Sequence, residues 1–584
     1  IGNASGFYGD RLTAMREMLE GGELDYLTGD YLAELTMLIL GRDRMKDPST
    51  GYAKTFIRQM QDCMGLAKEK GVRIVTNAGG LNPAGCAAKL REIAAEQGLD
   101  ISIAHVEGDD LLARASELAF GNVMTANAYL GAFGIAAALN TGADIVVTGR
   151  VTDASVIVGP AIAHFGWERE DFDKLAGAVV AGHIIECGTQ ASGGNFSGFT
   201  SIDLGRPGFP IAEISDDGSL VITKHSGTSG AVTVDTVTAQ LVYEITGEAY
   251  LGPDVTTHLD TMTLTQSGPD RVGITGVTGS PPPATAKVCL NVIGGFRNSV
   301  EFILTGLDIE EKAALVRTQM ENALKDSPPD VIEWQLDRTD VSDPATQAAA
   351  TTLLRCHVKS SSPEQVGRAF SGAAIELALA SYPGFAVTRP PAAGTPYGIY
   401  RAAYVPQGEV PHTVVLADGT RIEIEPPGVT DPDLASGADS SASGANSGKT
   451  GAENPESGPL GETVATPGET VATPLGRLAF ARSGDKGGDA NVGVWIPADH
   501  PRRDEAYAWL QSLLDEKTVK RLLPEAAELD IDIHPLPNIK AVNIVIHGLL
   551  GDGVAASTRL DAQAKALGEW IRARFVDLPQ EFLA

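Results

Sequence analysis

Cysteine is scarce in this chain of 584 residues, which carries only five. They are widely scattered, and no two form a CxxC pair: Cys63, Cys86, Cys187, Cys289 and Cys356. A disulfide framework or a structural zinc site needs closely spaced pairs, so neither is predicted. Unpaired thiols are typical of a reducing compartment, and we expect the protein in the cytoplasm.

Basic residues are also few. Lys and Arg total 45 against 75 Asp and Glu, which gives a net charge of −30. This charge repels the phosphates of nucleic acids and of anionic lipids, so no nucleic acid partner is predicted. No run approaches the roughly 18 apolar residues of a membrane helix, and no basic segment followed by an apolar one opens the chain. We therefore expect no membrane partner either.

The familiar catalytic and cofactor motifs are missing. No GxGxxG follows an expected strand, and there is no GxSxG, HExxH, EF-hand loop or kinase signature. Gly448-Lys449-Thr450 resembles the end of a phosphate-binding loop, but its first glycine, Gly444, is one residue too near and no strand precedes it. We predict no metal and no nucleotide cofactor.

The first 245 residues repeat a strand, a loop and a helix, which is typical of a doubly wound, Rossmann-like α/β domain. Strands are expected at 72–76, 144–148 and 220–224, each followed by a loop rich in Gly, Ser, Thr or Asn. Such loops meet at the carboxyl edge of an open sheet, where free amides and helix dipoles favour anions. The predicted substrate-binding residues of these loops are Asn77, Gly79, Gly80, Arg150, His225, Ser226 and Thr228.

One loop of this kind is more often a plain turn, but three in one domain favour a shared, anion-binding crevice. Two of the helices that follow carry start signals. Pro83 opens one with Asn82 as its N-cap, and Asp153 is expected to cap the next.

Composition divides the rest of the chain. Residues 246–426 are expected to form a second α+β domain. Residues 427–475 are rich in Gly, Ser, Pro and acidic side chains and carry GETVATP twice, so they are expected to form a disordered linker. Residues 476–584 alternate apolar strands with helical stretches, which predicts a small α+β domain.

The best catalytic candidates stand at the end of an expected helix that begins near residue 172. His183, Glu186 and Cys187 are spaced i, i+3 and i+4, so they share a helical face. That face could offer a general base, a carboxylate partner and a thiol. The glycine-rich stretch that follows could wrap a substrate with Gly193 and Asn195. The alternative is a core His and Cys with Glu186 at the rim.

A second concentration of charge lies at 482–491, between two expected strands at the start of the C-terminal domain. Its two successive glycines permit a tight turn, and its cations and amides could meet an anionic ligand. A plain turn with self-paired charges is the alternative. We predict that this domain docks, placing Asp485 and Lys486 near the crevice or a subunit interface, with an apolar contact from Trp495.

Together these segments resemble the acyclic terpene utilisation (AtuA-like) family. The resemblance rests on SGFYGDR at 5–11, TGDYL at 28–32, TNAGG at 76–80, TGRVTDA at 148–154, ECG at 186–188, GGN at 193–195 and HSGT at 225–228. The stretch at 482–491 is similar to the start of that family's C-terminal ferredoxin-like domain. The family is linked with the breakdown of acyclic terpenes and branched acyl-CoA thioesters.

The resemblance leaves two kinds of function open. In the first, the chain is a metal-free lyase or hydratase acting on a branched or unsaturated acyl-CoA. Arg150 and loop amides would hold the anionic or thioester end, while His183 with Asp153 or Glu186 would move protons. Coenzyme A is then part of the substrate, and no other cofactor is expected. In the second, the chain is a non-catalytic acyl-CoA-binding or scaffold subunit of a carboxylase-type partner. In either case we expect a homo-oligomer.

Overall fold

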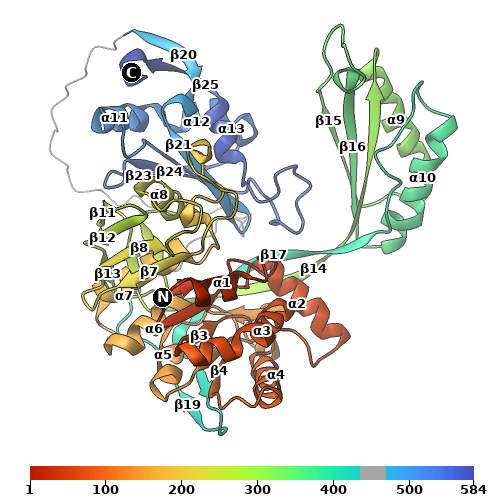
Figure 1. Cartoon of the computed structure of the whole chain (residues 1–584). Coiled ribbons are helices and arrows are strands. Elements are labelled where there is room, and N and C mark those ends of the chain that lie inside the picture. The colour runs from red at the N-terminus through yellow and green to blue at the C-terminus, as the bar shows by residue number, and fades with distance from the viewer. Residues whose placement is uncertain (435–468, 584) are drawn as a thin grey trace. The chain divides into compact units, whose positions relative to one another are not determined.

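The computed structural model describes residues 1–434 and 469–583. They divide into two compact units (Figure 1). Unit 1 comprises residues 1–291, 400–554 and 561–584, and unit 2 comprises residues 292–399 and 555–560. The sequence had suggested a second domain at 246–426, and the structure assigns the two ends of that range to unit 1. The central part of the proposed linker lies outside the described residues.

A mixed sheet forms the centre of unit 1. Its described strands follow the order β11-β12-β8-β7-β1-β2-β3-β6-β4-β18-β19. The parallel strands are β1 (Gly2–Asn3), β2 (Tyr26–Gly29), β3 (Arg73–Thr76), β6 (Ile145–Thr148) and β4 (Ile103–Glu107). Antiparallel pairing adds β7 (Pro210–Ile214), β8 (Leu220–Lys224), β12 (Arg271–Thr275) and β11 (Thr263–Gly268) on one side, and β18 (Thr413–Val415) and β19 (Arg421–Glu423) on the other.

Helices cover both faces of the parallel strands because their side chains point alternately to either side. Ile74 and Val147 pack in one core with α1 (Ala14–Gly21), α3 (Lys54–Lys70) and α4 (Pro83–Glu96). Their neighbours Val75 and Val146 pack in the other core with α5 (Phe133–Asn140), α6 (Ser155–Phe165) and α7 (Phe172–Ile185). The α/β class is confirmed. The order β1-β2-β3-β6-β4 differs from the doubly wound dinucleotide-binding order, so the Rossmann-like detail is not confirmed.

Several smaller elements complete the N-terminal part of unit 1. They are α2 (Glu34–Lys46), β5 (Thr125–Ala128), α8 (Val234–Leu241), β9 (Ala249–Leu251), β10 (Thr256–His258) and β13 (Thr278–Ser280). No helix among the described residues combines the length and the apolar character needed to cross a membrane.

Local start signals were correct at α4 and wrong at α6. Asn82 accepts a hydrogen bond from the Gly85 amide at 2.9 Å and caps α4, as predicted. Asp153 does not cap α6, which begins at Ser155 after Ala154. The carboxylate of Asp153 is therefore free to take part in other contacts.

The C-terminal part of unit 1 is a four-stranded antiparallel sheet of described strands in the order β21-β22-β24-β23. These are β21 (Phe480–Lys486), β22 (Asp489–Trp495), β24 (Ala541–Ile546) and β23 (Ile531–Leu536), with helices α11 (Arg503–Leu513), α12 (Glu516–Leu522) and α13 (Leu567–Ala573). β20 (Thr470–Pro474) pairs with β25 (Phe575–Pro579). The end of the predicted linker is thus a strand.

Unit 2 is a sheet covered by helices around a core of its own, which includes Phe302, Val316 and Phe370. Its strands are β15 (Val331–Asp337) and β16 (Thr351–Ser360) together with parts of β14 (Thr285–Thr305) and β17 (Thr395–Pro406), and its helices are α9 (Ile309–Ala323) and α10 (Phe370–Glu376). β14 and β17 also belong in part to unit 1, so the chain passes between the units within these two strands, and it does so again on either side of residues 555–560.

Candidate active site

Neighbouring parallel strands of unit 1 carry polar residues directly after their carboxyl ends. Asp30 follows β2, Asn77 follows β3 and Arg150 comes two residues after β6. The Asn77 amide donates to Asp30 Oδ1 at 2.5 Å, and its oxygen accepts from the Tyr31 amide at 2.8 Å. Asn77 therefore fixes the orientation of Asp30.

Arg150 is a buried cation, with 2% of its surface exposed. Its backbone amide donates to Asp109 Oδ2 at 2.8 Å, and its guanidinium donates to the Leu32 carbonyl at 3.1 Å. The guanidinium also lies over the Tyr129 ring, 4.4 Å from its centre. Asp109 holds the loop in place, and burial raises the pKa of this carboxyl to about 7.

Asp153 pairs with the guanidinium, Nη1 to Oδ1, at 3.1 Å. Glu186 and His183 approach from the end of α7, with His183 Nδ1 3.8 Å from Glu186 Oε1. Oxygen atoms of Asp30, Asp153 and Glu186 all lie within 4.8 Å of one another. The structure thus brings three carboxylates from three separate segments to one point beside a buried arginine.

This crowding shifts the protonation of the carboxyl groups. Burial, followed by the negative charge of Asp153, raises the pKa of Asp30 to about 8. Burial raises the pKa of Asp153 against the opposing effect of Arg150, and burial with the two aspartates raises that of Glu186 further. Burial also lowers the pKa of His183 to about 4, which leaves its ring neutral at pH 7.

The C-terminal domain brings further charges to this point through β21 and β22. The predicted loop at 482–491 is a hairpin whose turn is only Gly487-Gly488. Lys486 Nζ lies over the Tyr250 ring at 5.8 Å, and the Lys486 charge acts on the pKa of both Asp153 and Glu186. Lys486 therefore lies close to the carboxylates, as expected.

Two further cations secure the hairpin. Lys565 contacts Glu244 Oε1 at 3.0 Å and Asp485 Oδ1 at 3.2 Å. Arg482, only 6% exposed, donates to the Asn195 carbonyl at 3.2 Å. Of these contacts, the one between Lys565 and Glu244 joins opposite charges across the interface. An ion pair alone adds little stability, so the interface needs apolar support.

That support comes from Trp495, as predicted. Its ring lies near Phe196 and Phe480, with centroids 6.4 and 5.9 Å away, and its indole nitrogen donates to Asp235 at 3.1 Å. Asn491 adds paired hydrogen bonds to the backbone of Val242 and Glu244. The C-terminal domain therefore docks on the α/β part of its own chain.

We call this assembly the charged cluster. Its members are Asp30, Arg150, Asp153, Glu186, Glu244, Asp485, Lys486 and Lys565. Asp153, Glu244 and Lys565 expose about a third of their side chains, at 30, 33 and 35%, whereas Asp30, Arg150 and Glu186 are buried. A ligand from solvent would therefore meet the first three side chains first.

The comparisons with known proteins agree with this two-part construction. A family model described as acyclic terpene utilisation family protein AtuA matches residues 1–416, well over half of the chain. The chain belongs to the acyclic terpene utilisation family. A second model, the AtuA ferredoxin-like domain, matches residues 473–577, so the C-terminal domain inferred from the sequence is confirmed as well. No curated protein and no solved structure matches the chain.

Cys187, predicted as a possible nucleophile, has the wrong surroundings for one. Burial and the neighbouring Glu186 charge raise the pKa of its thiol well above the ordinary range. The thiol stays protonated at neutral pH, whereas a nucleophilic cysteine needs a lowered pKa. The other four cysteines are free and buried.

The loop after β8 does not reach the charged cluster, which corrects the prediction for His225, Ser226 and Thr228. β7, β1 and β2 separate β8 from β3, a distance of about 19 Å at roughly 4.8 Å per strand step. His225 instead pairs through Nε2 with the Met18 carbonyl at 2.9 Å, and Thr228 donates to the His225 carbonyl at 2.7 Å. Ser226 is exposed.

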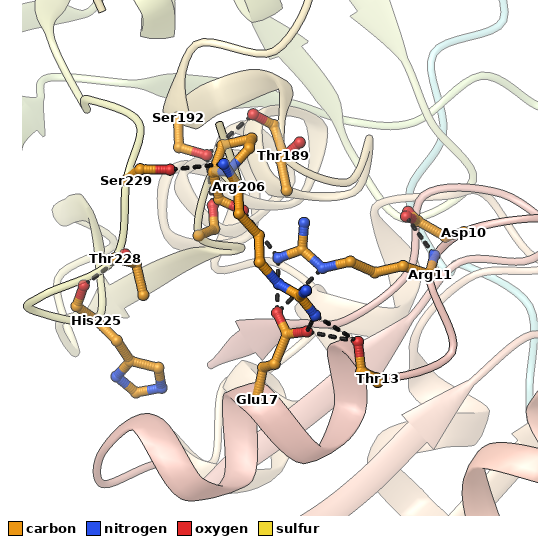
Figure 2. Close-up of polar contacts among 12 residues, drawn as sticks. Asp10, Arg11, Thr13, Glu17, Thr189, Ser192, Arg206, His225, Thr228 and Ser229 are labelled. Carbon is orange, nitrogen blue, oxygen red and sulfur yellow. Dashed lines mark hydrogen bonds and ion pairs between the residues drawn. The ribbon is translucent and has the colours of Figure 1, made fainter. Parts of the chain in front are cut away.

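Figure 2 shows the polar contacts around that loop. Glu17 of α1 accepts hydrogen bonds from Arg11 at 2.7 Å, Arg206 at 2.5 Å and Thr13 at 2.6 Å. Although burial alone would raise it, these hydrogen bonds lower the pKa of Glu17 to about 2. This network ties α1 to the loop before β7, and its side chains are already paired with one another.

The glycines that the sequence predicted to bind substrate are required by the backbone geometry of their loops. A Cβ at Gly79 would lie 2.5 Å from the Thr148 carbonyl, so only glycine lets this loop approach the end of β6. Gly80 adopts φ +53° in the same turn. Gly193, with φ +106°, shapes the stretch that leads to Asn195, whose carbonyl receives Arg482. None of the three offers a side chain to a ligand.

Sequence reasoning missed Asp30, Glu244 and Lys565. Asp30 could have been found, since it directly follows a strand, as Asn77 does. Glu244 and Lys565 carry no motif signal, and only the docking of the C-terminal domain brings them together.

A small cavity near the cluster is not the substrate site. It measures about 40 Å³ and is lined by Tyr129, Arg169, Asp254 and His412 among others. A cavity of this size holds a few waters and no acyl chain.

Proposed function

We propose that the chain is an enzyme of acyclic terpene or branched-chain acyl-CoA breakdown, a lyase or hydratase acting on a CoA thioester. The observation that carries the proposal is the meeting of three carboxyl groups of raised pKa with Arg150 and Lys486. Strongly shifted pKa values beside buried cations are typical of sites that transfer protons.

The charge and the exposure of each residue suggest its role in this reaction. Arg150 and Lys486 would stabilise the negative charge that develops on the thioester oxygen when a proton is added to or removed from the α-carbon. Asp153, the most exposed of the three carboxyls, would face the substrate. Glu186 and the neutral His183 beside it would supply and accept protons.

In the hydration direction, the oxygen of water bonds to the β-carbon of an unsaturated thioester and the carbon–carbon π bond breaks. One water proton passes to a basic group of the site, and the α-carbon takes a proton from an acidic one. The lyase direction reverses these transfers. A site that holds both protonated and proton-accepting groups at neutral pH suits either direction.

A panel of branched and unsaturated CoA thioesters, incubated with the purified chain and read by mass spectrometry, tests the proposal. We expect one of them to gain or lose water, and Asp153→Asn to slow that reaction by about 10²–10⁴-fold. Asp110→Asn is the matched control, because Asp110 pairs with Arg44 at 3.0 Å outside the cluster. Binding of the thioesters with no turnover across the panel would exclude an enzyme of this class.

The second candidate is a non-catalytic acyl-CoA-binding or scaffold subunit of a carboxylase-type partner. It is favoured by the large apolar side chains that unit 2 exposes, Leu307, Ile375 and Leu379. Ile375 and Leu379 stand four residues apart at the end of α10 and in the turn that follows it, and exposed apolar side chains that lie together often mark a protein contact. Thioester binding without turnover in the same panel would support this candidate.

A further inference from the structure

The meeting of Asp30, Asp153 and Glu186 raises a question of charge. Their oxygen atoms lie within 4.8 Å of one another, and Asp30 and Glu186 are only 5 and 7% exposed. Arg150 compensates Asp153 at 3.1 Å. The Lys486 charge acts on Glu186, and without a further cation the raised pKa values of Asp30 and Glu186 favour their protonated forms. Coordination of a metal is the other way in which buried carboxyl groups are accommodated.

A polar atom at this point lacks a partner. Glu186 Oε2 is buried and has no hydrogen-bond partner among the described residues. His183 is 3% exposed and lies beside this oxygen's carboxyl group, with Nδ1 3.8 Å from Glu186 Oε1 and the backbone of Leu241 and Gln240 close to its ring. Buried polar atoms are nearly always satisfied in folded proteins by protein groups, water or a ligand, so Glu186 Oε2 marks a position at the cluster where a water or a ligand would bind.

We propose that Asp30, Asp153 and Glu186 bind a divalent cation of the hard, oxygen-preferring class, Mg²⁺ or Mn²⁺. Carboxylate oxygens are the ligands these ions prefer, and a site with three protein ligands leaves positions for water or a substrate oxygen. The three ligands come from the loop after β2, the loop before α6 and the end of α7. This proposal replaces the metal-free site expected from the sequence.

The surroundings of Asp30 are those of an oriented metal ligand. Asp30 Oδ1 accepts hydrogen bonds from the Asn77 side chain at 2.5 Å and from the Leu32 amide at 3.0 Å. Hydrogen bonds of this kind fix the direction of a ligating carboxylate and strengthen metal binding. Asn77 is thus a positioning residue for Asp30.

The cation site deepens the proposed function at one point. With the cation bound, the three carboxylates would be ionised ligands, so His183 alone would carry the proton transfers that Glu186 and His183 share in the cation-free site. Cation binding itself does not depend on the reaction, because it can be measured on the chain alone. If the chain binds the cation but turns over no thioester, the cation site stands and the proposed enzyme is excluded. If the chain turns over a thioester but binds no cation, the enzyme stands and the cation site is excluded.

Mn²⁺ titrated into the metal-free chain and followed by electron paramagnetic resonance tests the site. A net charge of −30 attracts cations weakly over the whole surface, so the comparison must be with matched variants. We expect one Mn²⁺ per chain in the unaltered protein and in Asp110→Asn. In Asp153→Asn and Glu186→Gln the affinity should fall by at least about tenfold. Mg²⁺ should displace the bound Mn²⁺.

Circular dichroism of each variant shows whether it is folded. Asp153→Asn is the informative variant if Glu186→Gln unfolds, because Asp153 lies on a loop with 30% of its side chain exposed. The proposal is overturned if the unaltered chain binds Mn²⁺ no more tightly than Asp153→Asn does. It is equally overturned if Asp110→Asn lowers the affinity as much as the cluster variants do, since binding would then follow overall charge.

Discussion

Replacing Lys565 by methionine should weaken the docking of the C-terminal domain, and the loss should depend on pH. Lys565 Nζ lies 3.0 Å from Glu244 Oε1 and 3.2 Å from Asp485 Oδ1, over the Tyr243 ring at 4.6 Å. Methionine keeps much of the apolar stem and removes the charge. Glu244 and Asp485 would then be left close together without their shared cation.

The size of the loss follows from Asp485. Burial and Glu244 raise the pKa of this carboxyl from its ordinary 3.8 to about 6, although Lys565 lowers it. Because the pKa is higher in the folded state than in the unfolded chain, ionisation of Asp485 lowers the free energy of unfolding as the pH rises from about 4 to about 6. Without Lys565 the pKa rises further, so the free energy of unfolding continues to fall above pH 6. If the pKa of Asp485 rises by one further unit, the free energy of unfolding falls by about 1.3 kcal/mol at pH 8 and by about 0.1 kcal/mol at pH 5.5.

Glu244 adds to the same trend. Burial would raise the pKa of Glu244, and Lys565 is the first of the cations that bring it below its ordinary value. With Glu244 a third exposed, we expect a total loss of about 1–3 kcal/mol at pH 8, between the values for exposed and for buried pairs.

Hydrogen exchange of the β21 and β22 amides, measured by mass spectrometry at pH 5.5 and 8, reports this local free energy of opening. Lys520→Met is the matched control, because Lys520 pairs with Glu516 on the surface of α12 and its loss should cost under about 0.5 kcal/mol at both pH values. An equal loss for Lys565→Met at the two pH values would refute the electrostatic reasoning. No loss at pH 8 would show that Lys565 does not secure the hairpin.

Three further changes test separate parts of the structure. His183→Gln should slow turnover of the thioester found in the panel by about 10²–10⁴-fold with little change in melting temperature, and an unfolded or fully active variant would remove His183 from the mechanism. Gly79→Ala should lower the melting temperature because its Cβ would meet the Thr148 carbonyl, whereas Gly65→Ala in α3, where the Cβ would make ordinary contacts at 3.8 Å with Leu99 and 3.9 Å with Gln97, should raise stability by up to about 1 kcal/mol. Glu17→Gln should cost about 1 kcal/mol at pH 7, because its lowered pKa of about 2 stabilises the fold above pH 4.5. That difference should narrow in thermal melts as the pH falls from about 4.5 toward 2, and a widening gap would contradict the assignment.

Local signals in the sequence predicted several strands, the start of one helix and one pair of neighbouring side chains. Runs of apolar residues predicted β3, β6 and β8, and Asn82 with Pro83 predicted the start of α4. The spacing of His183 and Glu186 placed both on one face of α7, where they meet at 3.8 Å. Each of these features depends on neighbours within about one helical turn, so the sequence carries them directly.

The tertiary structure alone decided which of these segments meet. The loops after β3 and β8 follow similar strands, yet β7, β1 and β2 lie between them, so His225 is far from Arg150. Strand order depends on the packing of the whole sheet, and nothing in a single strand records it. The contact of Lys565 with Glu244 depends likewise on docking between domains that are distant in the chain. The sequence by itself predicted β3, β6, β8, the start of α4 and the family. Long-range packing decided that Asp30, Asp153 and Glu186 share one site, because their proximity arises only when all three segments are folded together.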